Sequence, residues 1–290
     1  MKKTIITLLI LFSTLFCLKA NAVSIVVDNS LYNTTVQANG VSRAFIMRID
    51  EGGQYDVVFK PLSDELTGSN GVNIPISYMY INNNSEDLYM RYQEETFLYR
   101  NQSFIDNDTK VLTAKILNYG MVPAGNYSIS MQFTVYEANT EIQVATGVYE
   151  MMFIVPVTQT ITFGAGQPTI NVINENAFRT SGKVSTTTTP LITIHSNCDW
   201  ELLADGTEMG DTVGNYYIKV SGASSGVLEK LVSDTKLNDV SSIVIARGRG
   251  PANGETLTMK YSVESKDGKF LKAGQYNNAI KYTLREYGGY

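Results

Sequence analysis

The sequence is almost without cysteine and histidine. Its 290 residues include two cysteines, Cys17 and Cys198, and one histidine, His195. Because Cys17 lies in a segment that we expect to be removed, only Cys198 would remain, and a single cysteine excludes an intramolecular disulfide. The acidic residues show no metal-ligand spacing or acid–base constellation, so we expect neither a metal centre nor a catalytic acid–base pair. The sequence predicts a protein that is not an enzyme and holds no cofactor.

Basic charge and long apolar runs are also scarce. The formal net charge is −5, and without residues 1–22 and their three lysines it becomes −8, from 20 basic and 28 acidic residues. Nucleic-acid binding requires a basic surface, which this composition excludes. Beyond residue 22, no apolar run approaches the length of a transmembrane helix, so we expect none in the mature chain.

The first 22 residues have the pattern of a secretory signal peptide. Met1-Lys2-Lys3 is basic, the stretch from Ile5 to Phe16 is apolar, and Ala20-Asn21-Ala22 matches a cleavage site. A lipoprotein signal at Cys17 is the alternative, but Phe16 is bulky where a small residue is required. We predict cleavage after Ala22 and export from a bacterial cell to the periplasm, the cell surface or beyond.

One stretch occurs twice in the chain, at Ala124–Val135 and at Ala273–Leu284. Each copy begins with Ala-Gly-polar-Tyr and continues with alternating residues. In the first copy the apolar positions are Tyr127, Ile129, Met131, Phe133 and Val135. Glycine suits a turn, and alternation is typical of a strand with one buried face. The repeat predicts two related domains, each with this strand near its end.

The rest of the chain predicts an all-β protein. Tyr, Thr, Val and Ile are frequent, short alternating runs are separated by Asn and Gly, and about eight strands fit each half. A thin segment with Pro156 and Pro168 separates the halves. We predict two tandem Ig-like antiparallel β-sandwiches, an N-terminal one at 23–157 that is a possible binding domain and a C-terminal one at 158–290. One helical turn is expected around Leu228–Leu231.

The candidate chemical residues have simpler structural interpretations. His195 and Cys198 are the only possible nucleophilic or metal-binding pair, but along one strand their odd spacing directs them to opposite faces. We interpret Cys198 as a small buried residue and Trp200 as a core residue. Asp106-Asn107-Asp108 lacks the further ligands of a calcium loop. The basic stretch Arg247–Pro251 is expected to be a solvated hairpin tip.

The end of the chain resembles a known family. Lys272–Leu284 is similar to the C-terminal strand of spore coat protein U-like and archaic chaperone-usher pilin subunits, which end on a Gly-x-Tyr turn and an alternating strand. The pilin domain of that family usually has a disulfide, which this chain cannot form. The resemblance implies a fibre in which each incomplete sandwich takes a strand from its neighbour. It also implies a periplasmic chaperone, an usher and other fibre subunits as partners.

On this interpretation two groups of residues form the polymerisation strands. The C-terminal group is Ala273, Gly274, Tyr276, Ile280, Tyr282 and Leu284, and the N-terminal group is Val23, Ile25 and Val27. The sequence thus predicts a fimbrial subunit or tip adhesin whose second domain joins the fibre. The alternative is a self-contained secreted or periplasmic protein that binds polysaccharide or another surface ligand. Exposed aromatic residues near loop tips would favour that alternative, and the candidates are Tyr78, Tyr80, Tyr89, Tyr92 and Tyr99.

Overall fold

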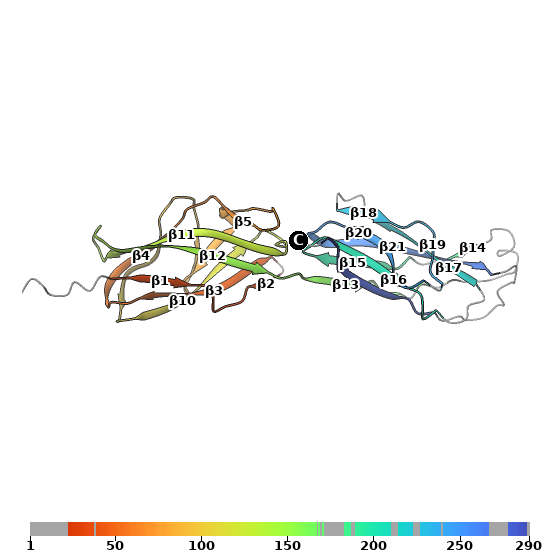
Figure 1. The fold of residues 1–290 in the computed structure, drawn as a ribbon, viewed down its shortest axis with the longest axis horizontal. Coiled ribbons are helices and arrows are strands. Elements are labelled where there is room, and N and C mark those ends of the chain that lie inside the picture. Colours follow the sequence, from red (N-terminus) through yellow and green to blue (C-terminus); the bar gives the residue numbers. More distant parts are fainter. Residues whose placement is uncertain are drawn as a thin grey trace, which may run out of the picture. The chain divides into compact units, whose positions relative to one another are not determined.

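The structure, a computed structural model, describes residues 23–37, 39–166, 168, 170, 183–186, 189–209, 214–222, 227–238, 240–266 and 278–288. Over these residues the chain is all-β, as predicted, and its paired strands run antiparallel (Figure 1). It divides into two compact units. Unit 1 contains the residues up to Tyr119 together with Asn126–Ile154, and unit 2 contains Gly120–Gly125 and the residues from Val155 onward. The predicted signal peptide lies outside the described residues.

Unit 1 is a sandwich of two six-stranded sheets. The first sheet has the order β1 (Ile25–Asp28), β3 (Gly40–Ile49), β10 (Asp108–Leu117), β7 (Met79–Asn82) and β8 (Asp87–Tyr89), with β2 (Thr35–Gln37) also paired to β3. The second has the order β6 (Ile74–Pro75), β5 (Glu65–Gly68), β11 (Gly125–Glu137), β4 (Gly53–Pro61) and β9 (Thr96–Phe104), with β12 (Gln143–Val155) paired to β11. A single 3-10 turn, η1 (Ile76–Tyr78), lies between β6 and β7.

The core of unit 1 follows the alternation of its strands. Phe133 of β11 is fully buried, and its ring centroid lies 6.2 Å from that of Phe45 on β3 and 6.4 Å from that of Phe59 on β4. The apolar positions of the first repeat copy are all buried, as the alternation predicted: Tyr127, Ile129, Met131, Phe133 and Val135. Aromatic residues from both sheets therefore fill the space between them.

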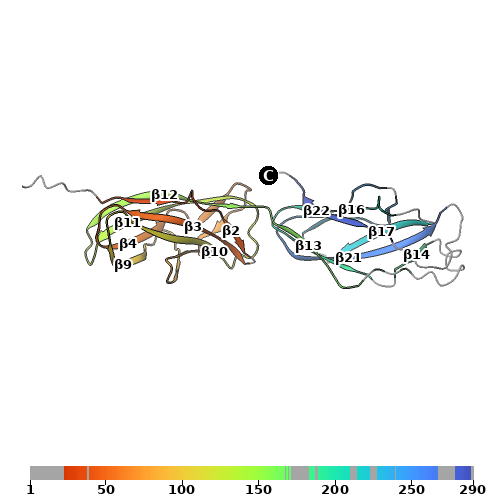
Figure 2. The same ribbon diagram turned by 90° about the horizontal axis from the view of Figure 1, so that it is seen from below.

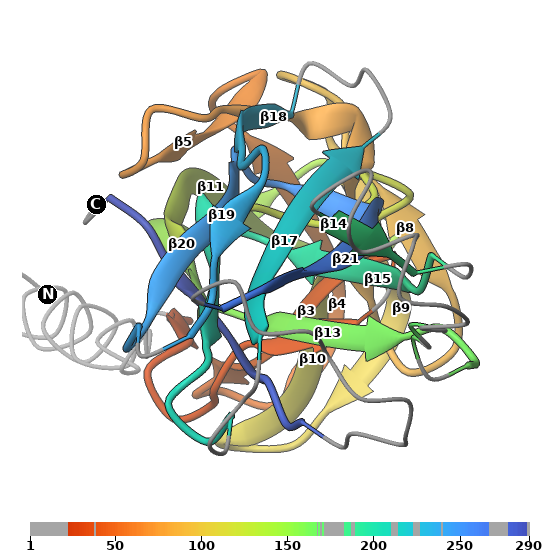
Figure 3. The same ribbon diagram turned by 90° about the vertical axis from the view of Figure 1, so that its right-hand side faces the viewer.

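Unit 2 also consists of two sheets. The larger has the order β13 (Gln159–Phe163), β15 (Leu191–Ser196), β21 (Ala252–Ser265), β17 (Gly214–Gly222) and β19 (Thr235–Lys236), with β14 (Lys183–Ser185) also paired to β21 (Figure 3). The smaller has the order β18 (Leu228–Leu231), β20 (Ile243–Gly248), β16 (Trp200–Asp205) and β22 (Lys281–Glu286). Figure 2 shows β16 and β22 in one layer and β13 and β21 in the other.

The core of unit 2 contains the one tryptophan of the chain. Trp200 is fully buried, as predicted, in a cluster with Ile194, Leu202, Ile245 and other apolar residues of both sheets. Gly248 is required beside it, because a Cβ atom at that position would lie 2.5 Å from Cζ2 of the indole ring. The tryptophan ring is therefore packed directly against the backbone of the neighbouring strand.

Two local predictions were wrong. Leu228–Leu231 forms strand β18 instead of a helical turn, because its backbone pairs with β20. Arg247 is also not part of a solvated hairpin tip. It lies within β20, and its guanidinium group contacts the buried carboxylate of Glu201. In both cases pairing with a strand distant in the sequence determines the local structure.

Candidate functional site

The described part of unit 2 contains the strand pairings of an immunoglobulin sandwich, with further strands beside them, but has no strand in the place of the last one. The strands β13, β15, β21 and β17 lie side by side as strands A, B, E and D do in that fold, and β16 and β22 pair as C and F do. In the complete fold a seventh strand, G, follows F in the same sheet. Among the described residues, no strand pairs with the edge of β22 that faces away from β16. We call this edge, together with β13, the open flank.

The register of β22 determines which backbone groups face the open flank. β22 pairs with β16 such that Leu284 lies opposite Leu202. The amide of Tyr287 donates a hydrogen bond to the carbonyl oxygen of Asp199, so the odd-numbered residues direct their backbone groups toward β16. The even-numbered residues Tyr282, Leu284 and Glu286 therefore direct their N–H and C=O groups outward. These groups could pair with an incoming strand.

The side chains along the open flank are apolar and incompletely covered. Ile280, Tyr282 and Leu284 pack against the unit 2 core but are only half-buried, and so is Ile161 on β13. The ring of Phe163 on β13 is 55 % exposed, and its centroid lies 5.8 Å from that of Tyr282. The core-facing residues of β11 in unit 1 are almost fully covered. The open flank thus combines unpaired backbone with partly exposed apolar side chains, the two properties that a complementary strand would cover.

A buried carboxylate holds β22 in its sheet. Glu201 on β16 is buried on the outer face of the sheet, and its Oε2 lies 3.0 Å from Nη2 of Arg247 on β20. Its Oε1 lies 2.5 Å from Nη2 of Arg285 on β22. Burial raises the pKa of Glu201, but the hydrogen bonds and charges of the two arginines outweigh burial and lower that pKa overall. Three adjacent strands are therefore connected through one ionised side chain.

The predicted polymerisation residues are divided between the two units. Ile280, Tyr282 and Leu284 lie at the open flank of unit 2. Ile25 and Val27 lie in β1, which pairs with β3 of unit 1, and Val23 precedes that strand. Ala273, Gly274 and Tyr276 lie outside the described residues. The structure therefore brings three of the nine predicted residues together at one edge.

The possible nucleophilic pair has separate surroundings. Cys198 is fully buried, as expected, and burial raises the pKa of its thiol. Its Sγ lies 3.6 Å from Oγ of Ser196 and 3.5 Å from Nε2 of Gln159. Nδ1 of His195 instead lies 3.2 Å from Oδ1 of Asn253. Cys198 therefore has the environment of a packing residue, because a buried thiol of raised pKa is a poor nucleophile.

The described residues contain no group of three His, Cys, Asp or Glu side chains arranged to hold a metal ion. Within the same part of the chain, none of the helical structure is long and apolar enough to cross a membrane. The arginines of the basic stretch are paired with acids, Arg247 with Glu201 and Arg249 with Glu229. These two arginines therefore do not form a free basic patch.

Sequence reasoning missed half of the open flank. Ile161 and Phe163 were treated as part of a thin connecting segment, although Phe163 contacts Tyr282. It also missed the arrangement of Glu201 with Arg247 and Arg285. An alternating Ile161-Thr162-Phe163 was the available signal for a strand, but the partner of a strand cannot be inferred from its own sequence.

Comparisons with known proteins return structures and no sequence relatives. No protein-family model and no curated protein matches the chain. Among solved structures, the CsuC–CsuE chaperone–tip adhesion subunit complex from archaic chaperone-usher Csu pili of Acinetobacter baumannii is similar, with 10% identity and a TM-score of 0.37. That similarity covers 81% of this chain and 85% of that one.

Two other adhesins are also similar. The CupB6 tip adhesin from Pseudomonas aeruginosa has 10% identity and a TM-score of 0.34, covering 91% of this chain and 93% of that one. A mutant of the CFA/I adhesin CfaE from enterotoxigenic E. coli has 8% identity and a TM-score of 0.30, covering 91% of this chain and 82% of that one. Similarity at this level does not by itself establish a function for this chain.

Proposed function

We propose that this protein is an exported subunit of an adhesive bacterial fibre, assembled by β-strand complementation at the open flank of unit 2. The observation that carries the proposal is the outward backbone of Tyr282, Leu284 and Glu286 beside the half-buried side chains of the flank. An incoming strand would add backbone hydrogen bonds along this edge and insert alternate apolar side chains beside Phe163. Its partners would be a periplasmic chaperone, an usher and another fibre subunit.

The N-terminal strand supports a position at the end of such a fibre. In unit 1, Ile25 is buried and β1 is paired with β3, so this segment could be donated to another subunit only by leaving its own sheet. A chain that accepts a strand but donates none would terminate a fibre. We therefore favour a tip adhesin, in which unit 1 is the binding domain and unit 2 joins the fibre.

The decisive experiment measures self-association and strand capture by the chain from residue 23 to its end. We expect the chain alone to associate in sedimentation velocity by pairing of its uncovered edges, without donation of β1. An excess of a synthetic peptide of residues 23–31, used as a free strand of alternating apolar residues, should convert it to a monomer of higher melting temperature. A peptide in which Ile25 and Val27 are replaced by Asp is the matched control and should have no effect. A chain that remains monomeric, unfolds cooperatively and ignores the peptide would contradict the proposal.

A pair of substitutions at one position tests the edge itself. Glu286 is exposed and its N–H faces the open flank, so Glu286→Pro removes one outward donor without altering the pairs with β16. We expect this variant to bind the peptide at least about tenfold more weakly than the wild type. Glu286→Ala keeps the donor and should bind normally. Equal binding by both variants would show that the peptide binds elsewhere.

The second candidate is a self-contained secreted protein that binds polysaccharide, and exposed aromatic residues on unit 1 favour it. Tyr89 is 60 % exposed and Tyr92 is 46 % exposed. The centroid of the Tyr89 ring lies 4.4 Å from that of the buried Tyr80, so Tyr89 presents one exposed aromatic ring supported by a second. Glycan-array binding by the monomeric chain, lost in Tyr89→Ala, would support this candidate. Binding without any strand capture would favour it over the fibre subunit.

A further inference from the structure

Strand β12 of unit 1 is also the edge of a sheet, but its backbone is covered. β12 pairs with β11 on one side. On the other side the connection between β1 and β2, residues Asn29–Thr34, approaches it and is joined by Arg43 of β3. We call Asn29–Thr34 together with Arg43 the edge cover. It belongs to the opposite sheet of the sandwich, so it closes one flank of unit 1.

Three side-chain hydrogen bonds connect the edge cover to alternate residues of β12. Nδ2 of Asn29 donates to the carbonyl oxygen of Glu150 at 2.9 Å, and Nη1 of Arg43 donates to that of Met152 at 2.6 Å. The amide of Ile154 donates to Oγ1 of Thr34 at 2.8 Å. Alternate residues of a strand direct their backbone groups to the same side. The edge cover therefore takes up one of the two backbone hydrogen bonds that another strand would need at each of these three residues.

Arg43 is unusual because it points into the sandwich. Its side chain lies between those of the buried Val41 and Phe45 on the inner face of β3. Only 7 % of its surface is exposed. Its Nε donates to the carbonyl oxygen of Tyr32 at 2.8 Å, so the two described acceptors of the guanidinium group are backbone carbonyls. Burial lowers the pKa of Arg43. Inward-pointing charged residues are one means by which natural sheets prevent edge-to-edge pairing.

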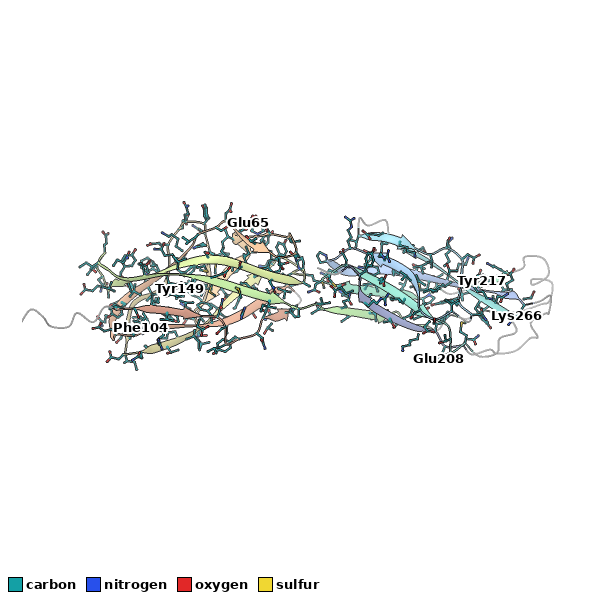
Figure 4. All side chains as sticks on the ribbon, viewed as in Figure 1. Glu65, Phe104, Tyr149, Glu208, Tyr217 and Lys266 are labelled. Atoms are coloured by element: carbon teal, nitrogen blue, oxygen red, sulfur yellow. The ribbon has the colours of Figure 1, made fainter. Side chains whose placement is uncertain are left out.

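A fourth contact reinforces the closure from β12 itself. The hydroxyl of Tyr149, labelled in Figure 4, donates to the carbonyl oxygen of Ile25 on β1. Gly147 makes room for this side chain, since a Cβ atom there would lie 2.6 Å from the Tyr149 hydroxyl. Unit 1 is thus closed on the flank between β1 and β12 by side chains from both sheets. At the open flank of unit 2, by contrast, no described strand pairs with the outward groups of β22.

We propose that the edge cover determines specificity of strand addition: it excludes an incoming strand from β12, so that the chain accepts a strand only in unit 2. The part of this proposal in which unit 2 accepts the strand rests on the proposed function. The closure of β12 can be tested without it. Removing Arg43 should expose the carbonyl oxygens of Tyr32 and Met152 and loosen Asn29–Thr34. The edge of β12 would then be available for pairing with a second copy of this chain.

The test uses Arg43→Met and the milder Thr34→Val, with Arg48→Met as the matched control. Arg48 lies on the same strand but is exposed on its outer face. Each substitution is made in the Glu286→Pro background, which removes one outward donor from the edge of unit 2, and the control reports the association that remains there. Hydrogen exchange at the Ile154 amide should accelerate at least about tenfold in the first two variants and stay unchanged in the control. In sedimentation velocity, only these two variants should associate beyond the level of the control as the concentration rises.

Three outcomes would overturn the proposal. Unchanged exchange at Ile154 in both variants would show that the edge cover does not protect β12. Accelerated exchange in a strictly monomeric variant would show that the exposed edge does not accept a strand. If circular dichroism shows that Arg43→Met unfolds unit 1, the test is made with Thr34→Val, which retains the arginine. A monomeric Thr34→Val would then contradict the proposal. Failure of the proposed function would appear separately, as a wild-type chain that neither associates nor captures the peptide of residues 23–31.

Discussion

The hydroxyl oxygens of Tyr261 and Tyr282 lie 2.5 Å apart, between the two sheets of unit 2. Tyr261 belongs to β21 in the larger sheet and Tyr282 to β22 in the smaller one. The pair is the main polar contact described beside the open flank, and burial raises the pKa of both phenols. The attachment of β22 thus depends on a neutral hydrogen bond on its inner face and on Glu201 on its outer face.

Removing one of these hydroxyls should destabilise unit 2. Tyr282→Phe leaves the Tyr261 hydroxyl buried without this partner, which is expected to lower the free energy of unfolding by about 1–2 kcal/mol. Urea unfolding followed by the fluorescence of Trp200 measures the loss, since Trp200 lies in the same unit. The double variant Tyr261→Phe, Tyr282→Phe should lose less than the two single losses combined. Additive losses would show that the hydroxyls do not interact.

The same pair predicts a loss of stability in alkaline solution. Because the folded-state pKa values of Tyr261 and Tyr282 are raised, their contribution is fully present below the ordinary tyrosine pKa of about 10. Above that pH the unfolded chain releases these protons more readily than the folded chain, so stability falls. The fall between about pH 10 and 11 should be smaller in the double variant. Unfolding curves at matched ionic strength provide the measurement.

Acid should weaken the other attachment of β22. The pKa of Glu201 is lowered in the folded protein, so its stabilisation is present above the ordinary Glu pKa of about 4.3 and is lost as the pH falls below it. At about pH 7, Glu201→Gln should lose about 1.5–3 kcal/mol, because a buried charge-assisted pair is broken. Arg285 is more exposed, so Arg285→Gln should lose less than about 1 kcal/mol. Urea unfolding of the two variants measures both losses, and equal values would contradict the central role of Glu201.

The contact between Gly248 and Trp200 should tolerate no added methyl group. Gly248→Ala would place Cβ 2.5 Å from the indole ring, and we expect a loss of about 1–3 kcal/mol with a shift in tryptophan emission. Arg249→Ala alters a nearby exposed residue and serves as the control, with unfolding close to that of the wild type. Wild-type stability in Gly248→Ala would mean that β20 can move away from the ring.

Features that depend on local pattern were predictable from the sequence. The alternation of Tyr127 to Val135 identified a strand and its buried face, and the position of Trp200 among apolar residues identified a core residue. All-β architecture followed from composition and turn spacing. These properties can be predicted without the strand order, because the alternation along a strand determines which face of the sheet each side chain occupies.

Features that depend on distant partners were not predictable. Leu228 and Leu231 have a spacing that also fits a helix, and only the pairing with β20 makes them a strand. Arg43 contacts Met152, which is 109 residues away. The alternation of β3 places Arg43 on the same face as Phe45, but the partner of its guanidinium group cannot be inferred from that alternation. The proximity of Phe163 to Tyr282 is likewise a result of sheet order. The boundary at residues 157 and 158, and the roles of the two domains, stay predictions.

The burial of Cys198 makes its alkylation rate a measure of how often unit 2 opens. It is the one cysteine after residue 22, it is fully covered by its neighbours, and the raised pKa of its thiol suppresses reaction with alkylating reagents. The sulfur can be labelled only when unit 2 opens, so the labelling rate under native conditions gives the frequency of opening. Any ligand or strand that stabilises unit 2 would slow the labelling of Cys198, and the measurement requires no substitution in the chain.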